Sequence, residues 1–119
     1  MTEPYYGNIE EDTVENDYYR KVIYTGKIQL VLMSLMPGED IPAEVHEDHD
    51  QFFRVEEGNG LIYIDNEEYP LIKDHAVIVP AGSLHYVTNI GDTPLRLYTI
   101  YGPPEHPGDR ADVYQPVES

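Results

Sequence analysis

Residues 38–58 read GEDIPAEVHEDHDQFFRVEEG, a run that starts and ends with glycine and carries two histidines among acidic residues. On a β-strand alternate side chains share a face, so Glu44 and His46 are expected to point the same way. A turn through residues 47–50 would let Gln51 return on the neighbouring strand. The run therefore predicts two strands that present a carboxylate, an imidazole and an amide around one turn.

A second run, residues 74–89, reads DHAVIVPAGSLHYVTN, and His85 begins a predicted strand just past its Pro-x-Gly turn. Four donor residues could thus converge inside one barrel: Glu44, His46, Gln51 and His85. Two imidazoles and one carboxylate are the usual donor set for non-haem Fe(II), and they also suit Mn, Co, Ni or Zn. On spacing alone, the alternative is that these acidic, histidine-rich turns are simply solvated.

The order of these spacings resembles the cupin superfamily. The first cupin motif is Gly, five residues, His-x-His, three or four residues, Glu, six residues, Gly. Residues 38–58 keep that spacing, with Glu44 in place of the first His and Gln51 in place of the Glu. The second motif is Gly, five residues, Pro-x-Gly, two residues, His, three residues, Asn, and residues 74–89 keep it with Asp74 in place of the Gly. The resemblance extends over about residues 28–107.

The resemblance implies that the four donor residues are metal ligands. Both exchanges in the first motif retain a donor, and the net charge of the set stays at −1 because Glu44 supplies the charge that Gln51 lacks. The chain is similar to small single-domain cupins that are often labelled mannose-6-phosphate isomerase-like, a label that says little about substrate. We expect a divalent metal ion as cofactor and leave Mn, Fe, Zn, Ni and Co open.

The strand pattern agrees with this fold, because short apolar or alternating runs recur between turns rich in Gly, Pro, Asn and Asp. No helical period is evident within the domain. The predicted strands are residues 19–24, 27–36, 41–46, 51–56, 61–64, 68–71, 76–79, 84–90 and 95–101. We expect an all-β double-stranded β-helix, the jelly-roll or cupin barrel, over residues 18–107. An acidic N-terminal arm at 1–17 precedes it, and a Pro-rich segment leads to a polar C-terminal tail at 108–119.

Composition narrows the classes of function. The chain of 119 residues has the size of one domain, and it has no cysteine, which excludes disulfides, thiolate metal sites and cysteine nucleophiles. Its formal net charge of −16 disfavours phosphate backbones and anionic membrane surfaces, so neither nucleic acid nor membrane is expected as a partner. No secretory signal is visible at the N-terminus, and we expect a cytoplasmic protein.

The three remaining histidines have simpler interpretations. His49 lies in the predicted turn, where we expect it to be solvated, although it could replace His46 as a ligand. His75 precedes a strand and is expected at the surface. His106 lies between prolines and is expected to serve in structural packing.

We favour a metalloenzyme that acts on a small polar organic molecule by isomerase-, lyase- or dioxygenase-type chemistry, with no catalytic residue assigned beyond the metal ligands. One alternative is a module that binds a small ligand without turnover. Another is a structural cupin for oligomerisation, which the intact donor set disfavours. Strand parity places Phe53, Val55 and Val87 on inner faces, and these residues would give the site apolar walls.

A homodimer is also expected. The apolar strand at residues 28–36 and the outward-facing Phe52 and Tyr86 would leave an exposed apolar patch on a monomer. Small cupins that resemble this chain usually dimerise. The net charge opposes association at low salt.

Overall fold

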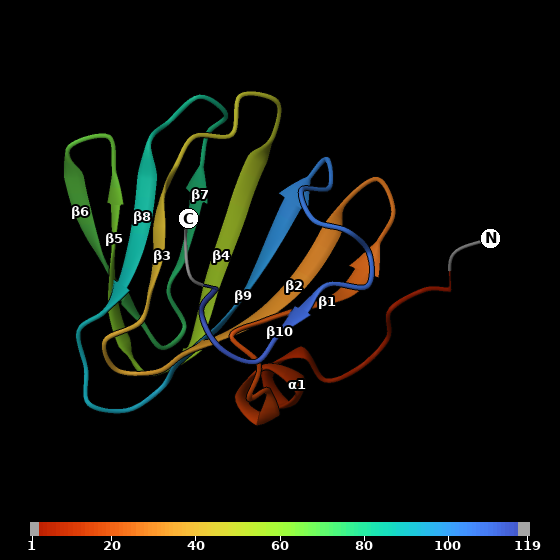
Figure 1. Ribbon diagram of the computed structural model, residues 1–119, viewed down its shortest axis with the longest axis horizontal. Coiled ribbons are helices and arrows are strands. Elements are labelled where there is room, and N and C mark those ends of the chain that lie inside the picture. Colours follow the sequence, from red (N-terminus) through yellow and green to blue (C-terminus); the bar gives the residue numbers. More distant parts are fainter. Residues whose placement is uncertain (1–2, 117–119) are drawn as a thin grey trace.

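The computed structural model describes residues 3–116, and it folds them into two antiparallel sheets with one short helix (Figure 1). The elements in chain order are α1 (Ile9–Glu15), β1 (Arg20–Thr25), β2 (Gln29–Leu35), β3 (Asp40–Glu44), β4 (Asp50–Glu57), β5 (Asn59–Ile64), β6 (Glu67–Ile72), β7 (Ala76–Val79), β8 (His85–Asn89), β9 (Leu95–Gly102) and β10 (Ala111–Asp112). One sheet has the order β10-β1-β2-β9-β4-β7, and the other has the order β3-β8-β5-β6. The prediction of an all-β jelly roll is confirmed.

The core lies between the two sheets, and inward-facing residues of both sheets supply it. From the first sheet these include Met33, Phe53 and Leu97, and from the second they include Ile62 and Val87. On β4 and β8 burial alternates along the strand, as expected for a sheet with one covered face. The predicted inward positions of Phe53, Val55 and Val87 are therefore confirmed.

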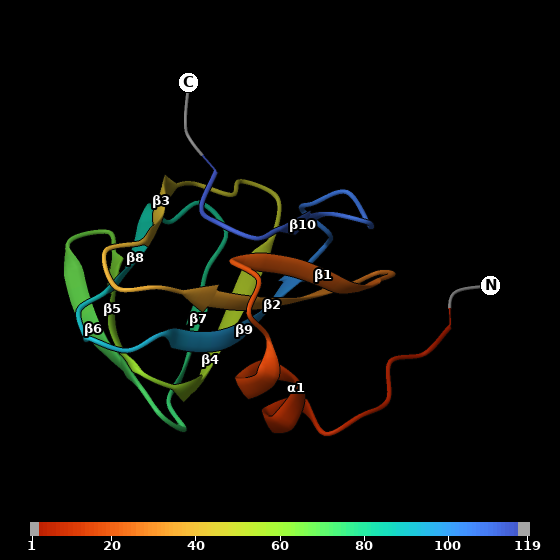
Figure 2. The ribbon, with the colours of Figure 1, turned by 60° about the horizontal axis from the view of Figure 1, so that its bottom comes forward.

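β2 is buried over its whole length. Its inner face, which includes Val31 and Met33, belongs to the core, and it pairs with β1 on one edge and β9 on the other. On the other face, α1 contacts β2, β9 and β4 (Figure 2). The chain thus covers this apolar strand by itself. The prediction that residues 28–36 leave an exposed apolar patch is wrong for residues 29–35, which are buried within the single chain. The homodimer stays a prediction.

The helix α1 forms because its N-terminal end is capped. The Asn8 side chain accepts a hydrogen bond from the Glu11 amide at 3.0 Å, and three acidic residues occupy the first turn, where they complement the helix dipole. At the other end, the Arg96 guanidinium donates to the Val14 carbonyl and pairs with Asp17 at 3.1 Å. The middle of the acidic arm predicted for residues 1–17 is therefore a docked helix, while residues 1–2 lie outside the described residues. No helix among residues 3–116 has the length and apolar character needed to span a membrane.

The segment after β9 returns across the barrel to place β10 beside β1. Its backbone is held by Gln29, a fully buried side chain at the start of β2. The amides of Glu105 and His106 donate to Gln29 Oε1 at 3.1 and 2.9 Å, and Gln29 Nε2 donates to the His106 carbonyl at 2.7 Å. This clamp fixes the Pro-rich segment against the barrel. Of the polar tail predicted at 108–119, residues 117–119 lie outside the described residues.

Candidate metal centre

Three of the four predicted donors lie at the ends of strands, and the fourth lies in a loop. Glu44 ends β3 and lies directly opposite His85, the first residue of β8, in the antiparallel ladder. Gln51 is near the start of β4, and His46 lies in the loop between β3 and β4. The loop before β8 is tied to the His46 loop because the amide of Gly82, which has a φ of +88°, donates to the His46 carbonyl at 2.9 Å. A glycine suits this left-handed conformation because it has no Cβ.

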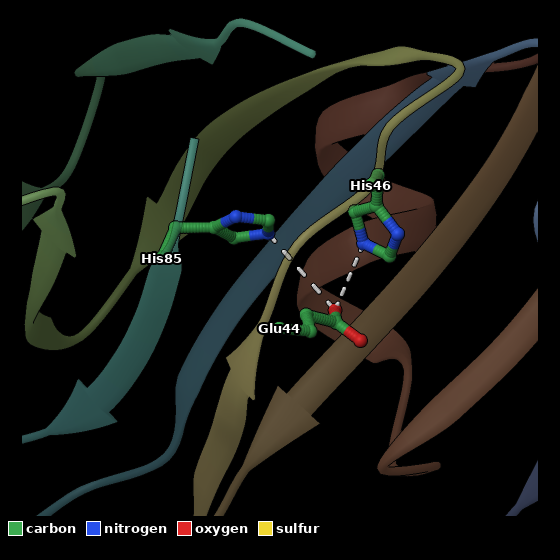
Figure 3. A group of neighbouring side chains, drawn as sticks. All are labelled: Glu44, His46 and His85. Carbon is green, nitrogen blue, oxygen red and sulfur yellow. Dashed lines mark ion pairs between the residues drawn. The ribbon is translucent and has the colours of Figure 1, made fainter. Parts of the chain in front are cut away.

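The donor atoms of Glu44, His46 and His85 lie close together (Figure 3). Glu44 Oε1 is 3.1 Å from His46 Nε2 and 4.0 Å from His85 Nε2. Gln51 Oε1 is 3.1 Å from His85 Nε2. Ligands bound to one ion at about 2.1 Å are separated by about 3 to 4.2 Å, depending on the coordination angle. The spacing of Glu44, His46 and His85 therefore fits a single divalent cation, and the Gln51 oxygen lies beside His85 Nε2.

Hydrogen bonds on the far side of two donors leave their site-facing atoms available. His85 Nδ1 lies 3.0 Å from the Ser83 carbonyl, to which it donates, so the lone pair of His85 is on Nε2. Gln51 Nε2 donates to Thr99 Oγ1 at 2.9 Å, which leaves the Gln51 carbonyl oxygen for the site. His46 Nε2 is buried and makes no hydrogen bond. A buried nitrogen without a hydrogen-bond partner is costly, and a bound cation would satisfy it.

Burial keeps His85 in the form that binds metals. The side chain is only 1% exposed, and this desolvation lowers its pKa, while the Ser83 carbonyl and Glu44 oppose the shift. The neutral imidazole is the metal-binding form, and Phe53 packs edge-on against it with ring centroids 6.4 Å apart. The site therefore combines a neutral imidazole with an apolar wall.

A second group of donors adjoins the first. His49 Nε2 is 3.1 Å from Glu105 Oε2, and His46 Nδ1 is 3.6 Å from the same oxygen. The prediction that His49 is a solvated turn residue is wrong, because its side chain is 9% exposed and its ring stacks on that of His46 with centroids 4.5 Å apart. His49 is two residues before Gln51 and points to the same side of the chain, so the inward direction of Gln51 carries His49 inward too.

Comparison with known proteins identifies the family. The cupin domain model matches residues 31–101, which contain both motifs. The chain belongs to the cupin domain family. It is 44% identical over 111 residues to the YrkC protein of Bacillus subtilis, which covers 87% of this chain and 60% of that protein. It is 42% identical over 117 residues to the L612 protein of Acanthamoeba polyphaga mimivirus, covering 94% of this chain and 73% of that protein.

A solved cupin of similar sequence confirms the architecture. The crystal structure of BH2720 from Bacillus halodurans superposes with a TM-score of 0.90 at 42% identity, covering 94% of this chain and 90% of that one. The chain spans about three fifths of the length of YrkC. None of these three names states an activity, so the function of this cupin is inferred from its site.

Other predicted roles are also settled by the structure. His75 is exposed, as predicted. His106 packs against the Tyr101 ring at a centroid distance of 5.3 Å, and burial lowers its pKa to about 4, which agrees with the predicted packing role. The Asn89 side chain joins the end of β2 to the turn before β9 by donating to the carbonyls of Leu35 and Thr93, both at 2.9 Å.

Three residues of this cupin's site were missed by sequence reasoning. Thr99 orients Gln51, Gln29 holds the backbone beside the site, and Glu105 brings a second carboxylate to it. Glu105 and Gln29 are 76 positions apart and meet only in the fold. The one local signal was the run of prolines around Glu105, which marked an ordered segment without indicating where its side chains point.

Proposed function

We propose that this cupin is a metalloprotein in which Glu44, His46, Gln51 and His85 hold one divalent cation, and that it acts as an enzyme on a small polar organic molecule. The observation that carries the proposal is the convergence of the Glu44, His46 and His85 donor atoms within 4.8 Å of one another, with the His46 nitrogen otherwise unpartnered. The ions that suit this mixed nitrogen and oxygen set are Mn, Fe, Zn, Ni and Co. The reaction would be of the isomerase, lyase or dioxygenase type.

The charges of the donor set favour a ligand with oxygen donors. One carboxylate, two neutral imidazoles and one amide carry a net charge of −1, so a bound divalent ion keeps a net positive charge for an oxygen of the substrate. When bound, the ion would supply Lewis-acid polarisation of that oxygen or activation of dioxygen. The protein's own part is to fix His85 and Gln51 through Ser83 and Thr99 and to exclude water with apolar neighbours such as Phe53.

The arginines support an unphosphorylated substrate. Arg54 pairs with Asp74 at 3.0 Å, and Arg96 pairs with Asp17 at 3.1 Å. Arg20 and Arg110 both bind the Asp112 carboxylate at 2.9 Å. A phosphate group is usually bound by arginine or lysine donors, and these four arginines already have carboxylate partners.

Metal content tests the ligand assignment. The protein is purified without a metal-affinity tag or chelator, and bound metals are measured by plasma mass spectrometry, followed by titration of the stripped protein with Co²⁺. The matched variants are Glu44→Gln and His85→Gln, which keep side-chain size, and His75→Gln is the control at an exposed histidine. Each ligand variant is expected to weaken Co²⁺ binding at least about tenfold, because even outer-shell changes at metal sites cost that much. Unchanged affinity and spectrum in His85→Gln would refute the assignment.

Turnover separates the enzyme from a binding module. The metal-loaded protein is incubated with a mixture of small polar metabolites and followed by proton NMR, with oxygen uptake recorded in parallel. Loss of one compound's signals with growth of new ones supports an enzyme, provided that His85→Gln abolishes the change. Broadening of a compound's signals without conversion would identify a small-ligand-binding cupin instead.

A further inference from the structure

A second set of possible metal ligands lies on the other edge of the His46 ring. His49 Nε2, Glu105 Oε2 and His46 Nδ1 all lie within 4.8 Å of one another. The individual separations are 3.1 Å between His49 and Glu105 and 3.6 Å between His46 and Glu105. These values fall in the range expected for ligands of one ion at about 2.1 Å. None of the proposed first-site residues other than His46 is part of this group.

The His49 nitrogen has no other use among the described residues. The side chain is more than nine-tenths buried, and Nε2 makes no hydrogen bond of acceptable geometry despite its short distance to Glu105. The ring is held by stacking on His46 and by the edge of Tyr101 at a centroid distance of 5.6 Å. A buried nitrogen that is fixed in place and left unpaired is costly unless something binds it.

Glu105 is held in place by its backbone. The Glu105 and His106 amides both donate to Gln29 Oε1, and the Gln29 side chain is fully buried. This anchor brings a carboxylate from the segment after β9 to a histidine in the loop between β3 and β4. The three ligands thus come from two segments that are far apart in the sequence and meet in the fold.

We infer that His49, Glu105 and His46 Nδ1 form a second binding position for a divalent cation of the imidazole-preferring class, such as Zn²⁺, Co²⁺, Ni²⁺ or Cu²⁺. The inference rests on the proposed function in one respect, since both positions share His46. A neutral imidazole has one lone pair and one N–H, so His46 serves one cation at a time. The second position is therefore an alternative location for the ion and not a second equivalent.

The two carboxylates exchange roles between the two positions. When His46 Nε2 ligates beside Glu44, the proton is on Nδ1 and faces Glu105. When Nδ1 ligates beside Glu105, the proton is on Nε2, and that nitrogen lies 3.1 Å from Glu44 Oε1. The ring proton moves between the nitrogens through solvent, and no charge is gained or lost.

The test uses the full chain with the first position removed. The double variant Glu44→Gln/His85→Gln is stripped and titrated with Co²⁺, with the visible spectrum and bound cobalt after gel filtration as readouts. It is expected to bind about one equivalent, more weakly and with a spectrum that differs from the unmodified protein. Adding His49→Gln, or separately Glu105→Gln, is expected to weaken this residual binding at least about tenfold. Adding His75→Gln instead is expected to leave it unchanged.

The outcomes separate this inference from the proposed function. No cobalt binding by the folded double variant, or residual binding that neither His49→Gln nor Glu105→Gln weakens, overturns the second position. The proposed function fails on a different result, namely His85→Gln alone binding Co²⁺ with unchanged affinity and spectrum. Far-ultraviolet circular dichroism checks that each variant is folded. Because Glu105 is partly exposed, the Glu105→Gln variant keeps the test available if His49→Gln does not fold.

Discussion

Replacing Gln29 with leucine should destabilise the protein by releasing the segment that carries Glu105. Leucine fits the volume but can neither accept from the Glu105 and His106 amides nor donate to the His106 carbonyl and to Thr25 Oγ1. Three backbone groups lose their partner. At about 1 kcal/mol of net stability for each hydrogen bond, the three bonds to the segment account for about 3 kcal/mol, and the bond to Thr25 brings the loss to about 4 kcal/mol.

Urea unfolding followed by circular dichroism measures this loss. With an m value of about 1.5 kcal/mol/M, the midpoint is expected to fall by about 2.7 M. Hydrogen exchange at the Glu105 and His106 amides is expected to accelerate in the same variant, because these amides lose their acceptor. A loss below about 1 kcal/mol would show that water or a rearranged backbone replaces the Gln29 contacts, and it would refute the reasoning.

The matched control is Thr25→Val. It removes the hydroxyl that accepts from Gln29 Nε2 at 3.0 Å but leaves the three bonds between Gln29 and the segment. Its expected cost is about 1 kcal/mol or less. Equal losses in the two variants would mean that the clamp on residues 105–106 contributes nothing to stability.

Three further changes test the fold and its electrostatics. Glu56 is 4% exposed, and burial raises its pKa above the ordinary 4.5, so its ionisation destabilises the folded state as pH rises through the folded pKa. Glu56→Gln should therefore raise the free energy of unfolding at pH 7, and this gain should be gone near pH 4. A loss of stability at pH 7 would contradict this. Asn89→Ala removes two bonds to carbonyls and one from the Gly91 amide and should cost about 2 to 3 kcal/mol in urea unfolding, whereas a neutral effect would mean that water substitutes for the side chain. Leu97→Ala empties a fully buried core position and should cost about 2 to 5 kcal/mol by the same measurement, with a smaller loss indicating that the core collapses around it.

The strands could be predicted because their signals are local. Burial alternates along β4 as the pleat requires, so the inward direction of Gln51 fixed that of Phe53. The spacings within the two motifs predicted that Glu44 and His85 converge, and the ladder pairs them. The same parity also pointed to His49, but its place in an acidic turn favoured solvent. The His49 side chain is instead buried beside Glu105, a contact that the local sequence does not reveal.

Long-range contacts explain what could not be predicted. α1 has few apolar residues, so it shows no amphipathic pattern, and its docking depends on Arg96 reaching from β9. The Gln29 clamp depends on a backbone segment 76 residues away, and a buried glutamine in an apolar strand gives no hint of its partner. The apolar patch expected on β2 is absent for the same reason, because helix α1 contacts β2 on the face turned away from the core.

The proposed function depends first on a divalent cation held by Glu44, His46, Gln51 and His85. The most direct test is an anomalous difference map from a crystal of the metal-loaded protein, with data collected above the absorption edge of the metal that plasma mass spectrometry identifies. We expect the main peak of this map between these four side chains, within about 2 to 2.3 Å of the His46 and His85 Nε2 atoms. A metal-loaded crystal whose peak lies elsewhere, or that shows no peak among these residues, would contradict it.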